Sequence, residues 1–153
     1  MEILVTASLQ DQPNGEAFIL TEGTGTLAHY PHMRAAGGLL WVSGLSARQP
    51  DQSIPGVTRG PEGTTREFVP QAEGVFANLK KVLAEAGADL SHVVDVFVML
   101  VRPEDYGAFN EVYNRHFEAP TGPTRTTCSV RALPLADLLV ELKVVAVDPR
   151  IRA

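Results

Sequence analysis

The order of apolar and turn-forming segments predicts an α+β fold, in which two helices cover one face of a sheet. Segments typical of strands and of amphipathic helices follow one another in the order β, β, α, β, α, β, β. The last strand, residues 138–147, places apolar side chains on both of its faces. Two helices can cover only one face of such a sheet, so we expect the other face to pack against further copies of the chain in a homo-oligomer.

The first part of the chain carries turn signals and few periodic apolar residues. Residues 1–28 are predicted to form an N-terminal extension with a short strand at 17–20, and residues 29–153 a single domain. Within the domain, GGLLWVSG at 37–44 is predicted to be a buried strand bounded by glycines. Residues 47–65 are rich in Pro and Gly and are predicted to be a loop, whose length indicates a function or a partner.

Two helices are predicted from apolar residues that recur every three to four positions. The first runs from about Val69 to Ala86, and Gly87 supplies a left-handed stop. A strand at 93–101 follows, and Pro103 is predicted to open the second helix. The apolar face of that helix consists of Tyr106, Phe109, Tyr113 and Phe117. The last two predicted strands are 122–130 and 138–147.

Composition and charge limit the class of protein and its partners. A chain of 153 residues with 44% apolar residues can bury one core, and its longest apolar run, residues 96–101, is far shorter than the roughly 20 residues of a membrane span. The start of the chain lacks the pattern of a secretory signal, and a single cysteine fits a reducing compartment, so we expect a cytoplasmic protein. A net charge of −5 without a basic cluster argues against nucleic acid and membranes as partners.

Cysteine and histidine offer little for metal binding or nucleophilic catalysis. Cys128 is the single cysteine and the four histidines are scattered, so no metal-ligand spacing appears and we expect no metal. Cys128 is interpreted as a small residue packed in a strand, since no base is identifiable beside it. His29 and His32 lie just before a strand and beside a proline, where a structural or a functional role fits.

Two charged residues lie in strands, where a charge needs an explanation. Arg125 follows Gly122-Pro123 and one threonine at a strand entrance, so its side chain could clamp a carboxylate; the alternative is a surface or ion-paired arginine. Glu141 lies in the middle of LLVELKVVAV, where burial would raise its pKa and suit it to hold a water and move a proton. The alternative for Glu141 is a pair with Lys143 or with an arginine across the sheet.

Ser43 and Gly44 end the strand at 37–44. A hydroxyl and bare backbone at this point could face a ligand, or could form a plain turn from strand to loop. Both readings stay open on these residues alone.

Five segments follow one another along the chain: PHMRAAGGLLWVSG, NLKKVLAEAGADLSHVVDVFVML, FNEVYNRHF, GPTRTTCSV and LLVELKVVAV. Together they resemble the Rid, or YjgF-like, family of reactive-intermediate imine and enamine deaminases, over about residues 31–148. The resemblance implies a chorismate-mutase-like fold with a mixed sheet, assembled as a homotrimer around a central barrel. Its active clefts would lie between subunits, and its reaction would be the cofactor-free hydrolysis of a 2-imino acid to a 2-oxo acid and ammonia.

The resemblance also implies roles for particular residues. Arg125 matches the arginine that grips the substrate carboxylate, and Glu141 matches the acid that positions the attacking water. Ser43 and Gly44 match the family's Ser-Gly pair in the site, and Asn110 matches an asparagine that we interpret as structural.

This chain departs from the usual family pattern in three places. Pro31-His32-Met33 stands where the broad deaminases have Pro-Tyr-Ser, Thr127 stands at the site position that is frequently Cys, and one residue is inserted before Glu141. Cys128 is therefore not the family cysteine.

The Pro-His pair and SGLSARQPDQSIPGV resemble the 2-aminomuconate deaminase branch, whose substrate is an enamine dicarboxylate. A second carboxylate needs a second cation, and Arg48 or a protonated His32 could supply it, with Arg34 as a weaker candidate. The hypotheses are thus a deaminase of 2-aminomuconate in aromatic catabolism, a broad deaminase of imines such as 2-iminopropanoate and 2-iminobutanoate, and a non-catalytic ligand-binding trimer.

Overall fold

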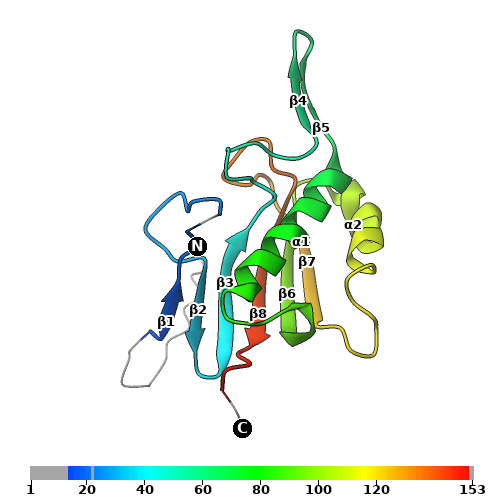
Figure 1. The fold of residues 1–153 in the computed structure, drawn as a ribbon. Coiled ribbons are helices and arrows are strands. Elements are labelled where there is room, and N and C mark those ends of the chain that lie inside the picture. The colour runs from blue at the N-terminus through cyan, green and yellow to red at the C-terminus, as the bar shows by residue number, and fades with distance from the viewer. Residues whose placement is uncertain (1–13, 22, 152–153) are drawn as a thin grey trace.

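A six-stranded mixed sheet with both helices in front of it forms the body of the protein (Figure 1). The computed structural model describes residues 14–21 and 23–151. The strand order is β1-β2-β3-β8-β6-β7, and only β6 and β7 run parallel. This confirms the predicted α+β sheet with two helices on one side.

The strands of this sheet are β1 (Glu16–Phe18), β2 (Met33–Ala36), β3 (Leu39–Leu45), β6 (Val93–Leu100), β7 (Thr124–Ser129) and β8 (Val140–Val147). The helices are α1 (Phe68–Ala84) and α2 (Tyr106–Tyr113), with 3-10 turns η1 (Leu90–His92) and η2 (Pro103–Asp105). A separate hairpin consists of β4 (Val57–Gly60) and β5 (Gly63–Arg66).

The predicted helices are present with small changes at their ends. α1 ends at Ala84 rather than Ala86, because the N–H groups of Gly87 and Ala88 turn back to the carbonyls of Ala84 and Leu83. Gly87 has the left-handed φ of 71° that the sequence predicts. The helix α2 ends at Tyr113, before Phe117.

Two predictions in the first half of the domain are wrong in detail. The predicted strand at 37–44 begins at Leu39, because Gly37 and Gly38 have φ values of 61° and 77° and form the turn between β2 and β3. The predicted loop at 47–65 contains the hairpin β4–β5, which stands away from the body in Figure 1. Its strands are mostly exposed and rich in Thr and Gly, so they lack the alternation of apolar residues from which a strand could be predicted.

The two faces of the sheet are different in kind. In β8 the core face consists of Val140, Leu142, Val144 and Ala146, all of which are buried under the helices. The opposite face carries Glu141, Lys143, Val145 and Val147, of which Val147 is 43% exposed. Neighbouring strands continue this bare face with the half-buried side chains of Trp41, Phe97 and Met99. The apolar second face predicted from the sequence is therefore present.

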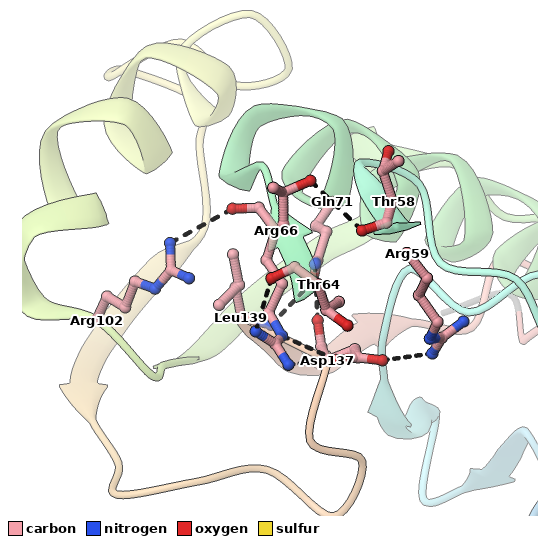
Figure 2. A network of polar contacts seen from close by, with 9 residues as sticks. Thr58, Arg59, Thr64, Arg66, Gln71, Arg102, Asp137 and Leu139 are labelled. Atoms are coloured by element: carbon pink, nitrogen blue, oxygen red, sulfur yellow. Dashed lines mark hydrogen bonds and ion pairs between the residues drawn. The ribbon is translucent and has the colours of Figure 1, made fainter. Parts of the chain in front are cut away.

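The segment that leads into β8 is held by a polar network, which Figure 2 shows. Asp137 accepts hydrogen bonds from Arg59 and Arg66 of the hairpin. Gln71 of α1 is fully buried, donates to the Asp137 carbonyl at 2.8 Å and accepts from the Leu139 N–H at 2.8 Å. These bonds satisfy backbone groups beside the core and fix the position of the segment before β8.

No helix within the described residues is long and apolar enough to cross a bilayer.

Candidate active site

Arg125 lies on β7 beneath α2, surrounded by aromatic rings. Its strand partner in β6 is Val96, which is fully buried, so the Arg125 side chain leaves the sheet on the helix side. The guanidinium carbon is 4.6 Å from the ring centre of Tyr113 and 5.8 Å from those of Tyr106 and Phe109. The Arg125 Nη2 group also donates to the Tyr106 hydroxyl at 3.3 Å. Aromatic faces attract the cation and hold it in place.

The partners of Arg125 are all uncharged. Among the residues that the structure describes, no carboxylate lies within 4.0 Å of its guanidinium. A guanidinium has five donors in a planar fork, and one contact to a phenol leaves most of them free. The position is therefore suited to an anion that none of the described residues provides.

The space beside Arg125 is an open pocket of about 420 Å³. Its lining consists of Leu100, Pro103, Tyr106, Arg125, Thr127, Cys128 and Ser129. Thr127, predicted to bind substrate, has a buried Oγ1 without a hydrogen-bond partner in the described part of the chain. This hydroxyl is an unpaired polar group in the wall of the pocket.

Glu141 lies on the bare face of β8, against a β-bulge in β3. Val42 pairs with Val144 and Leu45 with Leu142, so Ser43 and Gly44 together face the single residue Lys143. A Cβ atom on Gly44 would lie 2.5 Å from Glu141 Oε1, so the bare backbone of Gly44 leaves room for the carboxylate where it lies, and a larger residue would require the carboxylate to shift. Burial raises the pKa of the Glu141 carboxyl above its ordinary value. The predicted Ser43-Gly44 pair thus shapes the surroundings of the predicted acid.

A second open pocket of about 420 Å³ lies beside Glu141. It contains Tyr30, Ser43, Gly44, Arg48 and Lys143 among its lining residues, together with Leu135 and Leu138 of the segment held by Gln71 and the hairpin. The hydroxyl of Ser43 donates to the Pro31 carbonyl at 2.7 Å, so its oxygen keeps a lone pair for a ligand or a water.

Arg125 and Glu141 do not meet within one chain. The first leaves the sheet on the side of the helices, and the second leaves it on the bare side. Each lines its own pocket, and neither pocket contains both residues. One chain therefore has a guanidinium without a carboxylate partner and a separate acid, but no pocket that contains both.

His32 contacts backbone groups through both of its ring nitrogens. Its ring is buried; Nδ1 accepts from the Leu20 N–H at 3.2 Å, and Nε2 lies 2.9 Å from the Thr24 carbonyl, to which it must donate. Both ring nitrogens thus hold the segment 20–24 against the domain, and the neutral ring has no nitrogen left for a carboxylate. Arg34 likewise donates to the carbonyls of Asn14 and Gly15.

Arg48 remains as the candidate for a second carboxylate. It is only 8% exposed, yet its guanidinium donates to uncharged oxygens, the Gln52 side-chain oxygen and the Gly25 carbonyl. In the described part of the chain no Asp or Glu pairs with it. Arg48 also lines the Glu141 pocket, so an anion bound there would gain a desolvated cation.

Three residues beside Arg125 or Glu141 were not predicted from the sequence as parts of the site: Tyr106, Tyr113 and Lys143. Tyr106 and Tyr113 were identified as one helix face but not as the surroundings of Arg125, because the pairing of β7 with β6 is not visible in local periodicity. Lys143 was considered only as an ion-pair partner of Glu141. The available sequence signal was that Lys143 lies two residues after Glu141, which puts both side chains on the same face of β8.

Cys128 is half-buried in β7 and lines the Arg125 pocket. Asn110, interpreted as structural, lies in α2 with a buried Oδ1 that has no partner within the described residues. Over residues 14–21 and 23–151, no group of three or more His, Cys, Asp or Glu could hold a metal ion.

Comparison with known proteins finds relatives over most of the chain. The model of the family described as Endoribonuclease L-PSP matches residues 22–148. RutC family protein slr0709 of Synechocystis is 37% identical over 120 residues, which are 78% of this chain and 86% of that protein. Reactive Intermediate Deaminase A of Arabidopsis thaliana, a chloroplast protein, is 31% identical over 120 residues, which are 78% of this chain and 59% of that protein.

Solved structures show the same fold. Yeast Mmf1 has a TM-score of 0.73 at 30% identity, over 86% of this chain and 98% of Mmf1. RidA from the Antarctic bacterium Psychrobacter also has a TM-score of 0.73, at 26% identity over 86% of this chain and 98% of RidA. Mmf1 of Saccharomyces cerevisiae is named as mitochondrial, and the cytoplasmic location of the present chain stays a prediction.

Replacing the buried acid should stabilise the protein in a pH-dependent way. Because the folded-state pKa of Glu141 is raised, the folded protein holds the proton more tightly than the unfolded chain, and near pH 7 it bears the cost of a half-buried charge. Glu141→Gln is expected to raise the free energy of unfolding at pH 7.5 by roughly 1 kcal/mol. The gain should shrink as pH falls toward the unfolded-state pKa of about 4.3.

Urea titrations at several pH values measure this difference, and Glu62→Gln at the exposed tip of the hairpin is the matched control, with an expected effect of less than about 0.5 kcal/mol. A Glu141→Gln variant that is less stable than the wild type at pH 7.5 would show that the charged carboxylate has a stabilising partner.

Proposed function

Because the chain belongs to the Endoribonuclease L-PSP family, also known as the Rid or YjgF-like family, we propose that it is a hydrolytic deaminase of 2-imino and enamine acids. The observation that carries this proposal is Arg125, a guanidinium held by neutral aromatic rings at an open pocket and lacking a carboxylate partner among the described residues. A 2-imino acid has the carboxylate that such a clamp would bind. The relative named Reactive Intermediate Deaminase A supports the same reaction class.

The reaction needs binding, a water and proton transfers. The substrate carboxylate docks on Arg125, which fixes the C=N carbon relative to the protein. Glu141 accepts a proton from a water as the water oxygen bonds to that carbon. Burial raises the pKa of Glu141 toward neutral pH, which makes the carboxylate a better base. Return of that proton to nitrogen gives a carbinolamine. Its hydroxyl proton then moves to the same nitrogen as the C–N bond breaks, so ammonia leaves and the C=O of the 2-oxo acid forms. No covalent bond to the protein is required.

The two halves of this machinery would meet between subunits. Arg125 and Glu141 leave opposite faces of one sheet, so a complete site needs Arg125 from one copy and Glu141 from another. The bare face carries Trp41, Phe97 and Met99, and a second copy packed there would bury their apolar surface. The homotrimer implied by the resemblance would meet both requirements.

For the substrate we propose an amino-muconate type of enamine dicarboxylate, as found in the catabolism of aromatic compounds. Arg48 supports this choice, because it is a buried cation with uncharged partners at the Glu141 pocket. Lys143 adds a second positive charge to the same pocket. A broad deaminase of small monocarboxylate imines is the second candidate, and the Arabidopsis relative named Reactive Intermediate Deaminase A fits it as well. The endoribonuclease of the family description has less support, since a net charge of −5 disfavours RNA.

Removing the Arg125 side chain should slow deamination strongly. Arg125→Ala is expected to lower kcat/KM for ammonia release from enzymatically generated 2-aminomuconate by about 10²- to 10⁴-fold, because two charge-assisted hydrogen bonds are lost. The exposed Arg131, just beyond β7, gives the matched control Arg131→Ala, which should keep wild-type kinetics. Wild-type protein that releases no ammonia above the spontaneous rate, yet binds 2-oxo acids, would instead indicate a ligand-binding trimer.

Arg48, the proposed second cation, should lower KM only for substrates that carry a second carboxylate. Arg48→Ala is expected to raise KM for 2-aminomuconate at least about tenfold more than KM for 2-iminopropanoate. Comparing two substrates on the same variant separates this effect from any loosening of the segment that Arg48 holds, since loosening alters both KM values. Equal changes for the two substrates would remove Arg48 from the site.

A further inference from the structure

The Tyr106 hydroxyl lies beside the clamp with its proton unused. Arg125 Nη2 is the donor of their hydrogen bond, so the Tyr106 oxygen accepts and its own O–H remains free to donate. No other hydrogen bond of this hydroxyl occurs within the described residues. Tyr106 is 46% exposed and lines the same open pocket as Arg125 and Thr127. The free proton is therefore available to the space where the anion would lie.

The three rings around Arg125 are not equivalent. Tyr113 and Phe109 are buried, at 8% and 0% exposed, and belong to the core cluster beneath α2. Tyr106 lies one turn before Phe109 and two turns before Tyr113, at the solvent end of the same helix face. Its oxygen lies 3.3 Å from Nη2 of Arg125. Two rings thus fix the cation from the core side, and the third adds a polar group at the mouth of the pocket.

We propose that Tyr106 is a substrate-binding residue that donates its phenol O–H to the carboxylate held by Arg125. The carboxylate would then receive donors from the guanidinium and from the phenol, and the Arg125–Tyr106 bond would keep the two at a fixed spacing before the ligand arrives. This inference rests on the proposed function, because it assigns a contact to the carboxylate of that substrate class.

Two substitutions at one position separate the hydroxyl from the ring. Tyr106→Phe removes only the oxygen and keeps the ring beside Arg125, whereas Tyr106→Leu removes both. Binding of 2-oxobutanoate, a stable 2-oxo carboxylate, is measured by calorimetric titration of the full chain at fixed ionic strength. The Kd is expected to rise about three- to tenfold in Tyr106→Phe, the loss of one hydrogen bond to a charged group at a half-exposed site. Most of the loss in Tyr106→Leu should already be present in Tyr106→Phe.

The kinetic prediction is a rise of KM by the same factor in Tyr106→Phe with kcat within about twofold of wild type, since the contact binds ground and transition states alike. A Tyr106→Phe variant with wild-type Kd would overturn the inference, and loss of affinity in Tyr106→Leu alone would assign the effect to ring packing. If the wild type does not bind 2-oxobutanoate, the inference is also wrong. If binding depends on the hydroxyl but no imine is hydrolysed, the inference holds and the proposed deaminase activity is what fails.

Discussion

The alternation of side chains along β8 is the constraint on which the rest of the structure depends. A strand sends successive side chains to opposite faces, so burying Val140, Leu142, Val144 and Ala146 under the helices forces Glu141 onto the other face. The same rule in β7 puts Arg125 with the core-facing residues of β6 and beneath α2. Moving either charged residue to the other face would require a one-residue slip, which would expose the core face of its strand.

Each of the two charged groups lacks an oppositely charged partner among the described residues. Arg125 has aromatic faces and a phenol in place of a carboxylate, and Glu141 is a half-buried acid that burial makes harder to ionise. Local structure holds each group in position. The aromatic rings fix the Arg125 guanidinium, while the β3 bulge and the bare backbone of Gly44 make room for the Glu141 carboxylate. A cation without a carboxylate partner and an acid whose pKa is raised by burial, each held by its surroundings, are typical of functional sites rather than of structural ion pairs.

Much of this architecture could be predicted from periodicity, and the remainder depends on pairing between distant segments. The stripe of α1, its stop at Gly87 and the two faces of the last strand follow from local residue order. The hairpin β4–β5 could not be predicted, since its exposed threonines show no apolar alternation. Alternation within β7 and within β8 also does not say which face of β7 lies on the same side of the sheet as a given face of β8. Only the strand register shows that Arg125 and Glu141 lie on opposite sides. The partners of His32 could not be predicted for a similar reason, because its contacts with Leu20 and Thr24 join the domain to a segment 8 to 12 residues earlier in the chain.

The central claim, that a working site combines Arg125 of one copy with Glu141 of another, can be tested by subunit mixing. Arg125→Ala and Glu141→Gln proteins, each lacking one half of the site, are unfolded together in equal amounts, refolded and assayed for ammonia release. If the site lies between copies, about a quarter of the interfaces combine both intact residues, and about a quarter of wild-type activity should return. Activity that stays at the sum of the two separate variants, with mixed oligomers verified by native mass spectrometry, would contradict the account.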